Sequence, residues 1–166
     1  MADLNKLLTP LFLSEKEIRK IIELMFFAYR DFTSEPDALL EKIMFGRAHH
    51  RVIYFVGKKE KITIKELLSI LQITKQSLSR VLNQLVKEKY IILSIGEDKR
   101  TKNLSLTKKG HELENELSTI QIKKIKNILK NANEDNISGF KTLLYEMIGD
   151  KNHKRDPRCC TRDHRY

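Results

Sequence analysis

The chain has 166 residues, with 32 Lys and Arg against 22 Asp and Glu, so its formal net charge is 32 − 22 = +10. Hydrophobic residues make up 40%, enough for a folded core, which excludes a wholly disordered basic protein. No apolar run is long enough to span a membrane and no secretion signal precedes the first helix, so we expect a cytoplasmic protein with no membrane partner. The two cysteines, Cys159 and Cys160, are adjacent, and no disulfide framework is expected.

The positive charge is concentrated in two segments. Residues 61–110 hold 11 basic and 4 acidic side chains (11 − 4 = +7), and residues 151–166 hold 6 and 2 (6 − 2 = +4). Residues 1–60 (10 − 9 = +1) and 111–150 (5 − 7 = −2) are close to neutral. A basic segment of this kind favours a polyanionic partner, either nucleic acid or an acidic membrane surface.

Helical spacing of apolar residues predicts two helices in the N-terminal third. The first begins at Ser14, in a capping box, and repeats apolar residues every three to four positions. Residues 34–37 (Ser-Glu-Pro-Asp) are expected to end this helix and begin a second one, because Pro is tolerated in a first helical turn. The second helix is expected to carry Leu40 and to stop near Gly57.

The middle of the chain predicts a helix-turn-helix followed by a hairpin. Thr63 opens a short helix with a second capping box, and Thr74 is the natural N-cap of a longer helix across a short connection. Residues 90–95 and 103–106 then have the β-rich or alternating pattern of strands, and the charged segment 96–102 is expected to be their turn. A hairpin directly after a helix-turn-helix is a wing.

The C-terminal third predicts two more helices. Thr107 is expected to cap a long helix that extends to about Lys130, and a last helix follows a turn at residues 131–136. From Gly149 onward the sequence has no apolar period, which predicts a disordered basic tail. The expected fold class is mainly α with a small β-hairpin wing, a winged helix-turn-helix lobe joined to additional helices.

The predicted helix after Thr74 has the composition of a DNA-recognition helix. Its apolar residues fall on one side, and the opposite side is small, polar and basic, with no acid between Lys75 and Lys87. Such side chains can bond base edges or phosphates, and free N–H groups at a helix N-terminus add phosphate donors. The candidate contact residues are Lys75, Gln76, Ser77, Ser79, Arg80 and Asn83. Any surface helix also has a polar face, so this feature alone leaves a purely structural role open.

The predicted hairpin tip supplies a second set of candidates. Lys99, Arg100 and Lys102 could enter a minor groove, whose negative potential attracts Arg. Asp98 is expected to hold Arg100 through a salt bridge or to fix the turn. A solvated β-turn is the alternative interpretation of the same residues.

In order and spacing, these motifs resemble the MarR family of winged-helix transcriptional regulators. The resemblance covers about residues 10–149 and depends most on residues 77–85, 96–100 and 106–110. It implies an obligate homodimer in which the N-terminal and two C-terminal helices interlock, while two winged-helix lobes bind a pseudo-palindromic operator. The implied division assigns residues 1–36 and 108–150 to dimerisation, 37–107 to DNA binding and 151–166 to the tail.

Regulators of this type are often released from DNA by a small phenolic or carboxylate ligand bound between the dimer helices and the lobe. The resemblance places Tyr29, Arg47, His50, Arg51 and Tyr54 in that region, and the last four share one helix face. An aromatic ligand with an acidic group could use this stripe. Alternatively, the Arg and His side chains tie neighbouring helices together.

These observations favour a homodimeric, sequence-specific DNA-binding transcriptional regulator, with repression as the expected effect. The alternative is a winged-helix module that docks on a protein or an acidic surface without operator specificity. The sequence has no nucleophile–base set, metal-ligand cluster or Gly-rich phosphate loop, so we expect neither an enzyme nor a cofactor or metal site. Double-stranded DNA, a second copy of the chain and a small aromatic or acidic effector are the expected partners.

Overall fold

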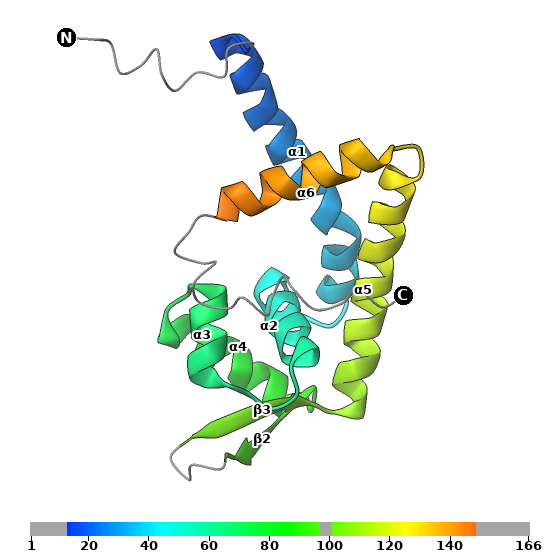
Figure 1. Cartoon of the computed structure of the whole chain (residues 1–166). Coiled ribbons are helices and arrows are strands. Elements are labelled where there is room, and N and C mark those ends of the chain that lie inside the picture. The colour runs from blue at the N-terminus through cyan, green and yellow to red at the C-terminus, as the bar shows by residue number, and fades with distance from the viewer. Residues whose placement is uncertain (1–12, 97–100, 149–166) are drawn as a thin grey trace, which may run out of the picture.

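The computed structural model describes residues 13–96 and 101–148. Within these ranges the chain forms α1 (Glu15–Glu41), α2 (Arg47–Lys58), β1 (Ile62–Thr63), α3 (Ile64–Leu71), α4 (Lys75–Lys87), β2 (Ile91–Ile95), β3 (Lys102–Leu106), α5 (Lys108–Leu129) and α6 (Glu134–Ile148). Helices α2, α3 and α4 and the β2–β3 hairpin form a lobe, and α1 and α5 lead away from it towards α6 (Figure 1). The predicted fold class, mainly α with a hairpin wing, is confirmed.

Four of the helices begin at the predicted caps. The side-chain oxygens of Ser14, Thr63, Thr74 and Thr107 each accept a hydrogen bond from the backbone N–H three residues later. At Ser14 and Thr63 the glutamate at that third position also bonds back to the cap residue, completing the predicted capping boxes. These short-range bonds satisfy N–H groups that a helix start leaves free, which is why sequence alone locates them.

The predicted boundary at residues 34–37 is wrong, because α1 continues through Pro36 to Glu41. Pro36 removes one intrahelical hydrogen bond, but both Pro36 and Leu40 are fully buried, so core packing holds the helix together across this position. The following turn reverses the chain at Met44, whose φ of 59° is left-handed, and α2 begins only at Arg47.

Two smaller features also differ from expectation. Helix α6 begins at Glu134, inside the predicted turn, because the Asn133 side chain accepts the backbone N–H of Asn136 at 2.8 Å and acts as a cap. The two-residue strand β1 was not predicted, since a pair of residues carries no detectable periodicity.

The three strands form one antiparallel sheet in the order β1-β3-β2. Ile62 pairs with Leu104, and Ile91 pairs with Leu106, so the predicted hairpin is present and β3 is its central strand. Apolar side chains from every part of the lobe, together with α1 and α5, close one core. Its fully buried members include Leu40, Ile53, Ile62, Leu67, Leu78, Leu85, Leu104 and Leu117.

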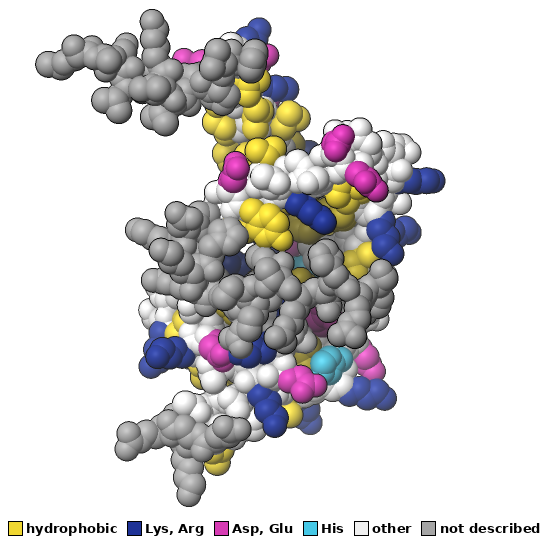
Figure 2. Space-filling model, in the orientation of Figure 1, with side chains coloured by type: hydrophobic (Ala, Val, Ile, Leu, Met, Phe, Trp, Pro, Cys, Tyr) yellow, Lys and Arg dark blue, Asp and Glu magenta, His cyan; other side chains and the backbone are white. Residues whose placement is uncertain are grey.

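The terminal helices are packed differently from the lobe. Helix α6 has no buried residue, and the first half of α1 is exposed although it carries many large apolar side chains. Hydrophobic side chains accordingly gather on the surface of α1 and α6 (Figure 2). Exposed apolar side chains gathered in this way are typical of an interaction face.

Candidate nucleic-acid interface

Helix α4 presents its apolar side to the core and its polar side to solvent. Leu78, Leu82 and Leu85 are buried and hold the helix against the lobe. All six predicted contact residues of this helix are exposed, namely Lys75, Gln76, Ser77, Ser79, Arg80 and Asn83. The helical-wheel prediction of two opposed faces is therefore confirmed.

The start of α4 is fixed by its cap. Thr74 Oγ1 accepts the backbone N–H of Ser77 at 3.1 Å and lies 2.9 Å from the Ser77 hydroxyl oxygen. No acidic residue occurs in the first turn, so the positive end of the helix dipole is not neutralised by the helix's own side chains. This end of α4 therefore favours an anion such as a phosphate.

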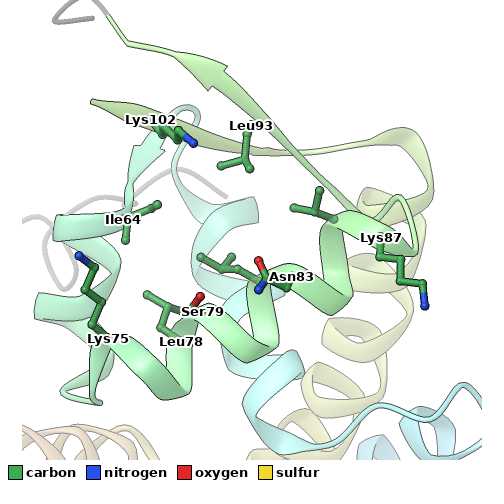
Figure 3. Close-up of a pocket in the computed structure, with 10 residues that line it drawn as sticks. Ile64, Lys75, Leu78, Ser79, Asn83, Lys87, Leu93 and Lys102 are labelled. Carbon is green, nitrogen blue, oxygen red and sulfur yellow. The ribbon is translucent and has the colours of Figure 1, made fainter. Parts of the chain in front are cut away.

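A groove of about 480 Å³ separates α4 from the hairpin. Lys75, Ser79 and Asn83 reach it from the helix, and Leu93 and Lys102 face it from the strands (Figure 3). The groove thus brings four of the predicted contact residues together across two elements, while Gln76, Ser77 and Arg80 lie outside its lining. Apolar residues of the lobe form its floor, and lysines stand at its rim.

The wing is described only in part. Lys102 is exposed at the start of β3, where it pairs in register with Ile95 of β2. The predicted contact residues Asp98, Lys99 and Arg100 lie outside the described residues, as do Cys159 and Cys160 in the tail.

The root of the hairpin is tied to the end of α4 through the start of α5. Thr107 Oγ1 donates to the Lys89 carbonyl at 2.7 Å, and Lys109 Nζ lies 4.0 Å from the centre of the Tyr90 ring. Gly110 approaches so closely that a Cβ there would lie 2.1 Å from the Tyr90 carbonyl oxygen. These contacts fix the position of the hairpin relative to α4.

A second cavity, of about 690 Å³, lies between α1, α2 and α5. All five residues predicted for an effector site line it: Tyr29, Arg47, His50, Arg51 and Tyr54. Helix α5 adds Gln121, Ile122 and Lys126, which sequence reasoning missed because they are about seventy positions away in the chain. The cavity combines aromatic rings with three cationic side chains.

The arginines of this cavity already have protein partners. Arg47 Nε donates to Asp37 Oδ2 at 2.7 Å and its guanidinium lies 5.4 Å from the Tyr29 ring centre. Arg51 donates to the Leu71 carbonyl at 3.2 Å, at the end of α3. The stripe therefore does tie helices together, and it also lines a space that a ligand could fill.

His50 is a half-buried titratable group in the same cavity. Burial lowers the pKa of His50, and the nearby carboxylates of Asp37 and Glu114 partly oppose that shift. A neutral imidazole at physiological pH leaves the positive charge of the cavity to Arg47, Arg51 and Lys126.

No group of three or more His, Cys, Asp or Glu side chains that could hold a metal occurs in residues 13–96 and 101–148. In that same part of the chain, no helix is both long and apolar enough to cross a membrane.

A capped helix pair, α3 and α4, followed by a hairpin whose root packs on the next helix defines a winged helix-turn-helix protein. A model of the MarR family matches residues 45–101, which contain α2, α3, α4 and β2 of this lobe. The HTH-type transcriptional regulator PetP of Rhodobacter capsulatus is 43% identical over 141 residues, covering 84% of this chain and 85% of its own length. The chain belongs to the MarR family of transcriptional regulators.

Solved structures share the same fold. FabT of Streptococcus pneumoniae, solved in complex with DNA, superposes with a TM-score of 0.71 at 22% identity, covering 81% of this chain and 99% of that one. A MarR-family regulator of Listeria monocytogenes, complexed with a 26mer DNA, gives 0.68 at 18% identity over 87% of this chain and 97% of that one. At these identities the likeness concerns the fold.

Proposed function

We propose that this chain binds a pseudo-palindromic DNA operator as a homodimer, represses transcription there, and is released by a small aromatic or acidic effector. The observation that carries the proposal is the exposed, acid-free polar face of α4 beside a groove rimmed by Lys75 and Lys102. Two solved structures with this fold were determined with DNA bound, which supports the same interpretation.

Each part of this face suits one part of a duplex. Arg80 and Asn83 offer the donors and acceptors that read guanine and adenine in a major groove. Lys75, Ser77 and Ser79, near the helix start, suit phosphate oxygens. Lys102 stands at the tip end of the described hairpin, where it pairs with Ile95, and Lys99 and Arg100, with Asp98 in support, are proposed to continue from it into the minor groove.

A second copy of the chain is the proposed partner of the terminal helices. Phe26 on α1 is 70% exposed, and Leu143 and Met147 on α6 are about 60% exposed (61% and 59%), although all three are large and apolar. Burial of such side chains between two copies would stabilise both. We assign residues 1–36 and 108–150 to this role and 37–107 to DNA binding, with the first boundary falling inside α1.

The cavity between α1, α2 and α5 is the proposed effector site. An aromatic ring would pack against Tyr29 and Tyr54, and an acidic group would take the guanidinium donors of Arg47 and Arg51. Such a ligand would compete with the Asp37 carboxylate and the Leu71 carbonyl for these donors. Thermal unfolding with benzoate tests this, and we expect stabilisation that Arg51→Ala removes and that Arg19→Ala, on exposed α1, leaves unchanged.

A gel-shift assay on the DNA upstream of the protein's own gene tests DNA recognition. We expect one or a few fragments to bind far more tightly than a shuffled duplex. If about six to ten phosphates are contacted, affinity falls by about 10³–10⁵ between 50 and 200 mM salt. Equal binding to every duplex, or no binding at low salt, would favour the module that docks on proteins or acidic surfaces.

Arg80→Ala identifies the surface that binds. Loss of a base contact is expected to cost about 1–3 kcal/mol of operator binding and to relax specificity at one position. Combining it with Arg100→Ala should weaken binding further while the fold stays intact. Lys42→Ala, which removes an exposed positive charge at the C-cap of α1 and lies outside the lining of both the groove and the cavity, is the control and should bind like the unmodified protein.

A further inference from the structure

A hydrogen-bonded group joins the recognition helix α4 to the turn between α1 and α2. His49 Nε2 lies 2.8 Å from Gln84 Oε1, and Gln84 Nε2 donates to the Met44 carbonyl at 3.1 Å. The other ring nitrogen, His49 Nδ1, accepts the backbone N–H of Gly46, also at 3.1 Å. We refer to His49, Gln84 and the backbone of Met44 and Gly46 as the His49–Gln84 clamp.

The clamp requires one particular form of the histidine. Since Nδ1 of His49 accepts a hydrogen bond, it carries no proton, and the neutral ring has its proton on Nε2. That proton is donated to the Gln84 carbonyl oxygen, which leaves the Gln84 amide nitrogen to donate to Met44. Each of the three hydrogen bonds of the clamp therefore joins a donor to an acceptor, and a change at either side chain breaks at least one of them.

Aromatic packing holds the histidine ring in place. The rings of His49 and Phe45 stack with centres 4.6 Å apart and planes 4° apart. Phe45 is buried and meets the ring of Tyr90 edge-on at 5.1 Å, and Tyr90 precedes β2. This stacking restricts the orientation of the half-buried His49 ring and holds its Nε2 towards Gln84.

The position of the clamp matches a need of the recognition helix. The buried side chains of Leu78, Leu82 and Leu85 set which side of α4 faces the core, but apolar contacts are not directional and leave small rotations about the helix axis to be fixed by other contacts. Hydrogen bonds are directional. Gln84 follows Asn83 directly and lies one turn after Arg80, so a rotation of α4 at Gln84 would move both of the proposed base-reading side chains.

We propose that His49 and Gln84 are positioning residues that fix the rotation of α4 and thereby set operator specificity. The inference rests on the proposed function, because it concerns how α4 meets DNA. It adds two residues that do not themselves face the groove and that link the recognition helix to the turn at the end of α1.

Two substitutions break hydrogen bonds of the His49–Gln84 clamp while leaving the apolar core of the lobe unchanged. Gln84→Met keeps the length of the side chain and removes both of its bonds. His49→Asn keeps a short acceptor for the Gly46 N–H but cannot reach Gln84. The matched control, His111→Asn, makes the same change at an exposed position of α5. Affinities for the operator and for a shuffled duplex are measured for each variant, together with its melting temperature.

We expect Gln84→Met and His49→Asn each to weaken operator binding roughly tenfold, the size of effect that loss of one or two hydrogen bonds produces. Binding to the shuffled duplex and its salt dependence should stay unchanged, because the phosphate contacts remain. The double variant should be no weaker than the stronger single variant, since both changes break the same link.

Two outcomes would overturn the inference while leaving the proposed function standing. One is unchanged operator affinity in both variants. The other is an equal loss for both duplexes with a lower melting temperature, which indicates a smaller folded fraction instead of a misplaced helix. If the unmodified protein fails to distinguish the operator from the shuffled duplex, the proposed function itself fails and the inference fails with it.

The unmodified protein allows a second measurement that does not depend on any variant folding. Nitrogen-15 NMR of the histidine rings distinguishes a proton on Nε2 from one on Nδ1. We expect the His49 proton on Nε2, both free and bound to the operator. A His49 ring protonated on Nδ1 contradicts the clamp.

Discussion

The lobe and the terminal helices use the same kinds of side chain in opposite ways. In the lobe, Leu67, Leu85 and Leu104 have no exposed surface, whereas Leu143 on α6 keeps 61% of its surface exposed. The chain therefore completes the core of the lobe by itself but leaves the apolar faces of α1 and α6 uncovered. Stability of the lobe is a property of one chain, and stability of the terminal helices depends on what covers them.

The largest expected effect comes from charging the uncovered face. Leu143→Asp with Leu144→Asp places two carboxylates where the proposed dimer buries apolar surface, and an unpaired buried charge costs several kcal/mol. We expect self-association to weaken by roughly 100-fold or more in sedimentation equilibrium. Ser69→Asp, on the exposed side of α3, is the control. A dimer that survives the double change would show that α6 lies outside the interface.

Adding a methyl group at a closely packed position of the lobe should produce the next largest effect, a loss of stability. In Gly110→Ala the added Cβ lies 2.1 Å from the Tyr90 carbonyl oxygen, so the root of the wing must move, at a cost of about 3 kcal/mol in the free energy of unfolding. Gly139→Ala, on α6, meets nothing within 4 Å and should stabilise the chain by about 0.5–1 kcal/mol. Urea unfolding of both variants measures the two changes in the free energy of unfolding. Equal changes would contradict the expected difference between the closely packed lobe and α6.

A smaller effect is expected at the start of α3. A hydrogen bond from Lys59, with further bonds from Thr63, lowers the pKa of Glu66 to about 2. Because this is below the value near 4.5 of an unfolded chain, Glu66 stabilises the fold at neutral pH, and that contribution is lost as the pH falls from about 4.5 to about 2. Glu66→Gln should cost about 1 kcal/mol at pH 7 and flatten this acid dependence in urea unfolding.

The equivalent change in the capping box of α1 tests whether a terminal helix contributes as much to global stability as the lobe does. Glu17 belongs to the capping box of α1, and hydrogen bonds from Ser14 lower its pKa as well. Glu17 is fully exposed and lies far from the core, so Glu17→Gln should change global unfolding less than Glu66→Gln does. An equal or larger loss would mean that the first turn of α1 is coupled to the lobe.

The smallest effect is expected at His50, where burial lowers the pKa. The unfolded chain then binds a proton more readily than the folded one, so folding stability should decline as the pH falls below about 6.5. His50→Gln removes this contribution, and urea unfolding between pH 7 and pH 5 should show a weaker dependence. An unchanged pH dependence in His50→Gln would contradict this assignment.

Local features made most of the fold predictable. Ser14, Thr63, Thr74 and Thr107 cap helices through bonds to residues three positions away, so the signal and its partner lie within one short stretch of sequence. Pro36 misled the prediction for the opposite reason. What keeps α1 intact there is burial against other elements, which sequence spacing does not reveal.

In the candidate site, too, features set by neighbouring residues were predictable and features set by distant contacts were not. The exposed face of α4 was predictable because its residues follow each other on one helix. The α5 lining of the cavity and the bond between His49 and Gln84, 35 positions apart, arise only when distant segments meet. His49 was visible in sequence as a neighbour of His50, but nothing in the sequence distinguished the direction of the two rings.

The unbroken course of α1 has a mechanical consequence. Helix α1 carries both the exposed apolar face and Leu40 of the core. A displacement of one end of this helix is therefore transmitted to the other end. Pro36 supplies no N–H and Thr33 bonds back to the Tyr29 carbonyl at 3.1 Å, but burial of Pro36 and Leu40 keeps the helix continuous across this turn. In the proposed dimer, the packing of α1 against the second copy would therefore help to set the spacing of the two recognition helices.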